Sequence, residues 1–175
     1  MTRRTLKVFD DKAWLDEFWS DSTYFTGPPL TDEMVREAEK RFRYKLPAGY
    51  WRLLRLRNGG SPRREYFHVT GLLGWTGGYL GVDSLRGIGD HFWCIDTPDS
   101  GLYPPIGLIV GDTPSGGHDY VMLDYRECGR EGEPRVVHAV QGRGLRGVTV
   151  LAADFAAFVA ALSAHEPGDE GEEDE

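Results

Sequence analysis

The first third of the chain carries apolar residues at helical spacing. In the segment DDKAWLDEFWS the apolar side chains recur with a period of about 3.6 residues and share one face, namely Trp14, Leu15, Phe18 and Trp19. This spacing predicts a short amphipathic helix. The two prolines of the TGPP stretch at residues 26–29 disfavour helix and should end it.

Two further helices follow in the next thirty residues. Thr31 is a good N-cap for a second helix, and Asp32 and Glu33 suit the positive end of its dipole. Its buried stripe consists of Met34, Val35, Ala38 and Phe42. The third helix, LPAGYWRLLRLRNGG, has a proline in its first turn and left-handed stop residues at its end. Its framework residues are Leu46, Pro47, Tyr50, Leu53, Leu54, Asn58, Gly59 and Gly60.

From Glu65 onward the pattern changes to short β-rich runs separated by glycine-containing turns. These runs are EYFHV (65–69), HFWCI (91–95), IGLIV (106–110), YVMLDY (120–125) and RVVHAV (135–140). The gaps between the later runs are too short for crossover helices, so the sheet should be mainly antiparallel. The closing segment 154–165 returns to helical spacing, with one apolar face formed by Phe155, Phe158, Val159 and Leu162. The order predicts a single α+β domain with N-terminal helices, a central sheet and a C-terminal helix.

Composition adds limits on location and class. The chain has 175 residues, which suits one domain, and no apolar run approaches the roughly 20 residues of a membrane span. Its first residues lack the apolar core of a signal peptide. Cys94 and Cys128 are its two cysteines, and reduced thiols are the simplest interpretation. We therefore expect a cytoplasmic protein without a membrane partner.

The negative charge of the chain comes from one end. The net charge is −8, but seven of the 28 acidic residues lie in the final segment 166–175. The remaining 21 acids face 20 bases, so the rest of the chain carries about −1. The tail has no apolar residue to bury and is expected to be disordered.

No group of residues predicts a catalytic or metal centre. His91 and Cys94 would point to opposite faces of a strand, which favours a structural role over metal binding. His118 and Asp119, with Asp112 nearby, could form an acid–base group, but their Gly-Pro-Ser context favours a turn. Ser115 lacks the glycine pattern of a nucleophile elbow. We expect no enzyme activity, no cofactor and no metal.

Two features could suggest phosphate or nucleic-acid binding. The loop GDTPSGG leads into a strand and not into a helix, so it lacks the N-terminal amides of a phosphate site. A basic cluster surrounds the end of the third helix and comprises Arg52, Arg55, Arg57, Arg63 and Arg64. In a nearly neutral body this cluster is more typical of a solvated helix face than of a nucleic-acid site, so we expect no direct nucleic-acid partner.

The long loop from residue 72 to residue 105 is rich in aromatic side chains of the kind enriched at interface hot spots. Trp75 and Tyr79 stand among glycines, and for them an interface role and a core role are equally supported. For Phe92 and Trp93 the pattern favours the core. Tyr103 completes the set of candidate contact residues.

The third helix, together with the segment before it, resembles the opening of the SUKH superfamily (Smi/Knr-type domain). Its sequence LTDEMVREAEKRFRYKLPAGYWRLLRLRNGG contains the family's Leu-Pro, Tyr, aliphatic pair and Asn-Gly-Gly stop. The segment IGLIVGDTPSGGHDYVMLDY is similar to the family's paired strands, and LAADFAAFVAAL to its last helix. Matching positions in these segments are Gly107, Gly111, Asp112, Asp119, Tyr120, Phe155, Phe158 and Leu162.

The resemblance implies a non-enzymatic protein-binding domain over residues 30–165, preceded by an extension (1–29) with the aromatic helix and followed by the tail (166–175). It implies an immunity protein that neutralises a neighbour-encoded bacterial toxin by direct contact. The alternative is an intracellular adaptor or regulatory scaffold, as in the fungal branch. Should the toxin be a nuclease with a basic cleft, exposed carboxylates would complement it. The candidate carboxylates are Glu65, Asp83, Asp96, Asp99 and Asp112.

The acidic tail should affect the rate of association if such a basic toxin is the partner. Deleting residues 166–175 removes seven negative charges and should slow association at low salt, because steering depends on the summed charge. Stopped-flow measurement at low and high ionic strength checks this expectation. An unchanged association rate would refute a role for the tail.

Overall fold

A computed structural model describes residues 5–98 and 101–164 of the chain. Its first two helical elements are a 3₁₀ helix, η1 (Thr5–Asp10), and α1 (Lys12–Asp16). They are followed by α2 (Asp32–Phe42) and α3 (Ala48–Leu56). A second 3₁₀ helix, η2 (Gly144–Gly147), and α4 (Phe155–Ala160) lie near the C-terminal end.

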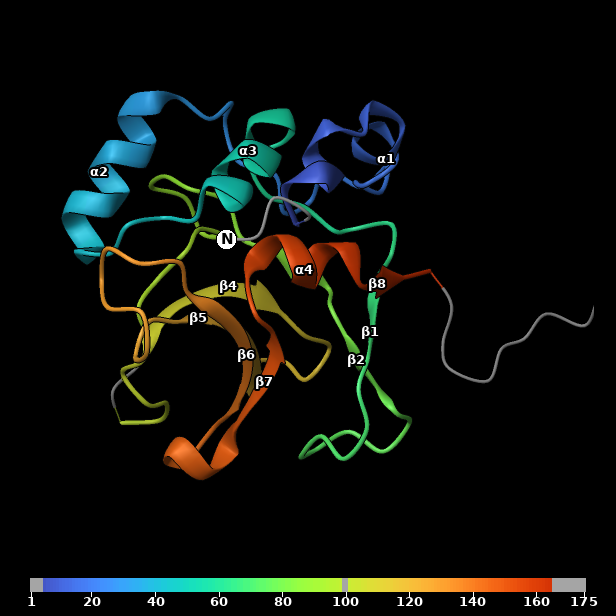
Figure 1. Cartoon of the computed structure of the whole chain (residues 1–175), viewed down its shortest axis with the longest axis vertical. Coiled ribbons are helices and arrows are strands. Elements are labelled where there is room, and N and C mark those ends of the chain that lie inside the picture. Colours follow the sequence, from blue (N-terminus) through green and yellow to red (C-terminus); the bar gives the residue numbers. More distant parts are fainter. Residues whose placement is uncertain (1–4, 99–100, 165–175) are drawn as a thin grey trace, which may run out of the picture.

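The strands form two antiparallel sheets. The larger sheet has the order β3-β4-β5-β6-β7 and the smaller one the order β2-β1-β8. The bounds are β1 (Tyr66–His68), β2 (Tyr79–Gly81), β3 (Ser84–Leu85), β4 (Gly107–Asp112), β5 (Asp119–Asp124), β6 (Arg135–Val140), β7 (Val148–Ala152) and β8 (Leu162–Ser163). In Figure 1 the first three α-helices lie along one side of the curved larger sheet, and α4 lies between them and the strands. The predicted α+β class with a mainly antiparallel sheet is confirmed.

Two predicted elements are wrong. The run HFWCI (91–95) is no strand, because only Cys94 makes a β-bridge, with Gly87, and Phe92 is 85% exposed. The C-terminal helix ends at Ala160, and Leu162 pairs instead with Phe67 of β1. Leu162 is buried all the same. Helical spacing of apolar residues indicates that they are buried. It does not show whether a helix or a strand carries each of them.

Both faces of the larger sheet are covered. The main core lies between one face and the helices, where Leu108, Val121 and Val136 meet Tyr50 of α3 and Phe155 of α4. Tyr50 and Phe155 pack edge to face with centroids 4.9 Å apart. The second, smaller core lies on the opposite face and comprises Tyr103, Ile106, Ile109, Met122, Val137 and Ala139.

The segment before α2 is part of the main core. Phe18 and Trp19 follow α1 and are 2% and 7% exposed. Arg57 donates hydrogen bonds to the carbonyls of Ser20 and Ser22, at 2.7 and 3.0 Å. Arg63 donates to the carbonyl of Trp19 at 3.3 Å. Within the basic cluster, Arg57 and Arg63 thus hold the N-terminal segment in place.

The end of α3 fixes a distant segment, residues 84–88. The fully buried Asn58 amide donates to the carbonyl of Ile88 (2.8 Å) and accepts from its N–H (2.7 Å). Gly60 and Leu85 exchange two backbone hydrogen bonds, and the Tyr50 hydroxyl donates to the Arg86 carbonyl.

Gly59 allows the close approach of this segment. Its φ is 88°, and a Cβ there would lie 2.8 Å from the backbone nitrogen of Gly87. Asn58 itself has no positive φ, so the expectation that it acts as a left-handed stop residue is wrong. Its amide is needed for hydrogen bonding, and the two glycines provide the turn.

Gly107 has a comparable role between β4 and β5. A Cβ at this position would lie 1.9 Å from the carbonyl oxygen of Leu123 on the neighbouring strand. Any side chain would therefore separate the two strands. Among the described residues, none of the helices is long and apolar enough to cross a membrane.

Replacing Asn58 should destabilise the whole fold. Asn58→Ala leaves the carbonyls of Pro28 and Ile88 and the Ile88 N–H without their partner. Because buried unsatisfied groups are costly, we expect a loss of about 3 kcal/mol in the free energy of unfolding. Urea denaturation followed by tryptophan fluorescence measures it. The control, exposed Arg52→Ala on α3, should change it by less than about 0.5 kcal/mol. A loss below about 1 kcal/mol for Asn58→Ala would contradict the role of Asn58.

Candidate functional site

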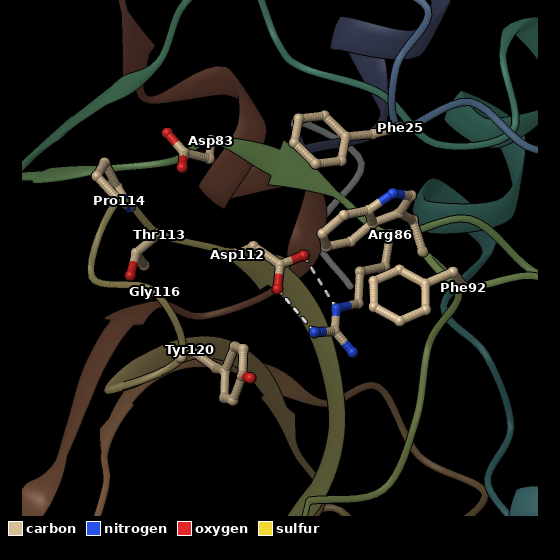
Figure 2. Close-up of a pocket in the computed structure, with 11 residues that line it drawn as sticks. Phe25, Asp83, Arg86, Phe92, Asp112, Thr113, Pro114, Gly116 and Tyr120 are labelled. Carbon is tan, nitrogen blue, oxygen red and sulfur yellow. Dashed lines mark hydrogen bonds and ion pairs between the residues drawn. The ribbon is translucent and has the colours of Figure 1, made fainter.

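A surface hollow of about 540 Å³ lies where segment 83–86, the β4–β5 turn and the loops around residues 25 and 92 meet. Its lining residues are Phe25, Asp83, Arg86, Phe92, Trp93, Asp112, Thr113, Pro114, Gly116, Gly117 and Tyr120. Figure 2 shows Phe25, Arg86 and Phe92 on one side, Asp83 and Pro114 on the other, and Asp112 between them. We call this hollow the main pocket.

An ion pair with two hydrogen bonds forms the floor of the main pocket. The Arg86 guanidinium donates from Nε to Asp112 Oδ2 (3.0 Å) and from Nη2 to Asp112 Oδ1 (2.7 Å). Both side chains are mostly buried, and Ser84 Oγ also donates to Asp112. Burial alone would lower the pKa of Arg86, but the bonds to Asp112 outweigh it and raise that pKa. The guanidinium also lies 5.1 Å from the centre of the Tyr120 ring.

Asp83 is the second carboxylate of the main pocket and is exposed. No hydrogen bond or ion pair to its side chain occurs within the part of the chain that the structure describes. Partial burial raises the pKa of Asp83, and the carboxylates of Glu65 and Asp112 raise it further. The Asp83 carboxylate is therefore flanked by other carboxylates and has no ion-pair partner among the described residues.

Four aromatic side chains form one cluster at the rim of the main pocket: Tyr24, Phe25, Phe92 and Trp93. The ring centroids of Phe25 and Trp93 are 4.8 Å apart, and those of Phe92 and Trp93 are 4.7 Å apart. Tyr24 packs on Phe25 at 4.9 Å. Tyr24 is 72% and Phe92 85% exposed, so the sequence-based preference for a core role of Phe92 is wrong.

A second hollow of about 260 Å³ adjoins the main pocket, and Asp83 and Pro114 line both. Glu65, Trp75 and Tyr79 line this side pocket. Five of the candidate contact residues therefore lie on one face, namely Glu65, Trp75, Tyr79, Asp83 and Asp112. We call the two pockets and their aromatic rim the acidic-aromatic face.

The other candidates lie elsewhere. Tyr103 is only 5% exposed, and its hydroxyl donates to the carbonyl of Gly117 at 2.6 Å, so it supports the turn beneath the pocket. Asp96 is exposed, and its carboxylate accepts from the N–H of Thr97. Asp99 lies outside the described residues, as does the acidic tail. Neither Tyr103 nor Asp96 lines the two pockets.

The sequence interpretation missed Arg86, Tyr24 and Phe25 as site residues. Tyr24 and Phe25 lie between the first predicted helix and the TGPP stretch, and Arg86 lies in a loop without a motif. Their only sequence signal was residue type, because arginine and aromatic residues are enriched at interfaces.

A buried polar network stands behind the side pocket. Asp119 Oδ2 accepts from Trp75 Nε1 at 2.7 Å and lies 2.9 Å from Nε2 of the fully buried His138. Its Oδ1 accepts from the hydroxyls of Thr113 and Ser115. Burial alone would raise the pKa of Asp119, but the adjacent His138 imidazole and the three donated hydrogen bonds hold it well below its ordinary value.

The structure separates the three residues that suggested acid–base chemistry. Asp119 is directed into the network, whereas His118 is exposed with its Nδ1 3.2 Å from Gln141. Asp112 is paired with Arg86.

The imidazole of His91 packs against Gly27, and its burial lowers the pKa of His91. Within residues 5–98 and 101–164, no group of three or more His, Cys, Asp or Glu side chains is arranged to hold a metal ion.

Removing the Asp119 charge should destabilise the protein in a pH-dependent manner. Because its pKa is lower in the folded state than in the unfolded chain, Asp119 stabilises the fold above about pH 4, and this contribution disappears as the pH falls. Asp119→Asn should cost about 2 kcal/mol at neutral pH.

Urea denaturation at neutral pH, at pH 4 and near pH 2 measures this effect. The difference between the wild type and Asp119→Asn should shrink toward the lowest pH. The exposed Asp96→Asn serves as the control and should change stability little at any pH. A pH-independent difference for Asp119→Asn would contradict an ionised Asp119.

Comparison with known proteins supports the assignment made from the motif. The model of the SMI1 / KNR4 family (SUKH-1) matches residues 29–161. No curated protein and no solved structure matches the chain significantly. The matched region includes α2, α3, both sheets up to β7 and α4. The chain therefore belongs to the SMI1 / KNR4 family (SUKH-1).

Proposed function

We propose that this protein is an immunity protein that neutralises a cognate bacterial toxin by covering it with the acidic-aromatic face. One observation carries the proposal: Phe92, 85% exposed, stands in an aromatic cluster at the rim of a hollow of about 540 Å³. Large exposed aromatic side chains beside a concave surface are typical of interface hot spots.

The acidic-aromatic face is held in place by contacts within the protein, which suits a preorganised binding surface. The Arg86–Asp112 pair forms the floor of the main pocket, and Asn58 and Tyr50 fix the segment that carries Arg86. A preorganised surface loses less side-chain entropy on binding, which favours affinity. The aromatic side chains of the rim project from loops attached to this support, as the backbone hydrogen bond from Gly87 to Trp93 shows.

Membership of the family supports a binding function, and the arrangement of the polar residues is consistent with it. The hydrogen-bonding capacity of Asp112 and Asp119 is used within the protein. We infer a cytoplasmic location, where the free thiols of Cys94 and Cys128 would stay reduced.

Co-expression tests the proposal. The protein is expressed with the toxin domain encoded by an adjacent gene, and cell survival and complex formation by size-exclusion chromatography are measured. Protection together with a stable complex would support an immunity function. Recovery of several unrelated partners in a pull-down, without protection, would favour the adaptor function and overturn the proposal.

Replacing Phe92 should weaken the complex without affecting the fold. Because its ring is 85% exposed, Phe92→Ala should change the free energy of unfolding by less than about 0.5 kcal/mol. As a hot-spot residue it should weaken toxin binding by at least about tenfold. Leu145→Ala is the matched control, since Leu145 is 59% exposed on η2, outside the acidic-aromatic face. Calorimetric titration measures the affinity of both variants for the toxin. Equal effects of the two substitutions would contradict this placement of the interface.

A further inference from the structure

We propose that the main pocket receives a cationic side chain of the partner, an arginine, which lies between the aromatic rim and the carboxylate of Asp83. This inference deepens the proposed function and rests on it. It concerns the chemistry of the contact, which the family assignment does not specify.

The charges that line the main pocket leave one negative charge unbalanced. Arg86 is neutralised by Asp112 through two hydrogen bonds of 3.0 and 2.7 Å, whereas the carboxylate of Asp83 has no partner among the described residues. Glu65 lines the adjoining side pocket and adds a further carboxylate. A cation placed beside Asp83 would therefore meet a net negative environment.

The walls of the pocket suit a guanidinium group. Phe25, Phe92 and Trp93 provide aromatic surface, and the main pocket holds about 540 Å³, enough for a side chain and part of its backbone. Aromatic faces attract cations, and the planar guanidinium also stacks on them, which favours arginine over lysine. Arg86, 5.1 Å from the centre of the Tyr120 ring, already shows this kind of contact in the same pocket.

The alternative occupant of the main pocket is an anionic ligand that binds Arg86. Two guanidinium nitrogens of Arg86 are bonded to Asp112, and its side chain is only 13% exposed. An anion at this position would also approach the carboxylates of Asp83 and Asp112. The arrangement therefore favours a cation, and an anionic probe is included in the test.

The test uses small probes, so that it does not depend on the toxin. Nα-acetyl-arginine amide is titrated into the ¹⁵N-labelled full chain and followed by NMR. The matched probes are the citrulline analogue, which is uncharged and nearly isosteric, and Nα-acetyl-glutamate amide, which is anionic. We expect saturable shifts at the Trp93 indole N–H and at the Asp83 amide with the arginine probe, with millimolar affinity for a ligand of this size. The citrulline probe should bind at least threefold more weakly.

A pair of variants identifies the carboxylate responsible. Asp83→Asn should weaken binding of the arginine probe at least threefold, since it removes the unpaired charge. Glu37→Gln on α2 lines a different hollow and should leave binding unchanged. The pKa of Asp83 should also be lower when the arginine probe is present. It is measured from the pH dependence of the chemical shift of its carboxyl carbon.

The outcomes separate this inference from the proposed function. Equal binding of the arginine and citrulline probes, stronger binding of the glutamate probe, or no saturation at tens of millimolar would overturn the inference. Neutralisation of the toxin would stand in each of these cases. Conversely, specific arginine binding without any toxin protection would support the cationic site and overturn the immunity function.

Discussion

The attachment of residues 84–88 to the end of α3 is the constraint on which the rest of the site depends. This short segment has only two residues in a strand, too few to hold its position through sheet pairing alone. The Asn58 amide binds both backbone groups of Ile88, and the missing side chain of Gly59 lets Gly87 approach closely. The motif that identifies the family therefore also fixes the position of the segment that carries Arg86.

From this segment outward, the site passes from buried polar contacts to partly exposed aromatic ones. The Arg86–Asp112 pair joins segment 84–88 to β4, and the buried Asp119 network holds the neighbouring turn and Trp75. Both groups of contacts are charge-assisted and shielded from water, which strengthens them. The rim beyond them consists of loops whose aromatic rings contact each other, with Tyr24 and Phe92 exposed and Phe25 and Trp93 partly buried.

The aromatic rim draws on a part of the chain outside the family match. Tyr24 and Phe25 precede residue 29, where the match begins, and they pack against Trp93 from the long loop. The segment before them is held to the core by Phe18 and by Arg57. The edge of the site thus combines residues inside and outside the family match, and side chains added to a common support are a general source of specificity.

The sequence by itself determined the elements that depend on local interactions. Thr31 caps α2 as predicted, and the β-rich run 135–140 is a strand with those bounds, because caps and strand-forming runs act over a few residues. The tertiary structure alone decided which residues meet. Asn58 binds a partner 30 positions away and Arg86 one 26 positions away, so no spacing in the chain could reveal either contact. The apolar run 91–95 resembles a strand. In the structure only Cys94 forms a β-bridge, with Gly87, and the side chain of Phe92 is exposed to solvent. Hydrophobic patterns indicate which residues can be buried, and only the packed chain determines which of them remain exposed.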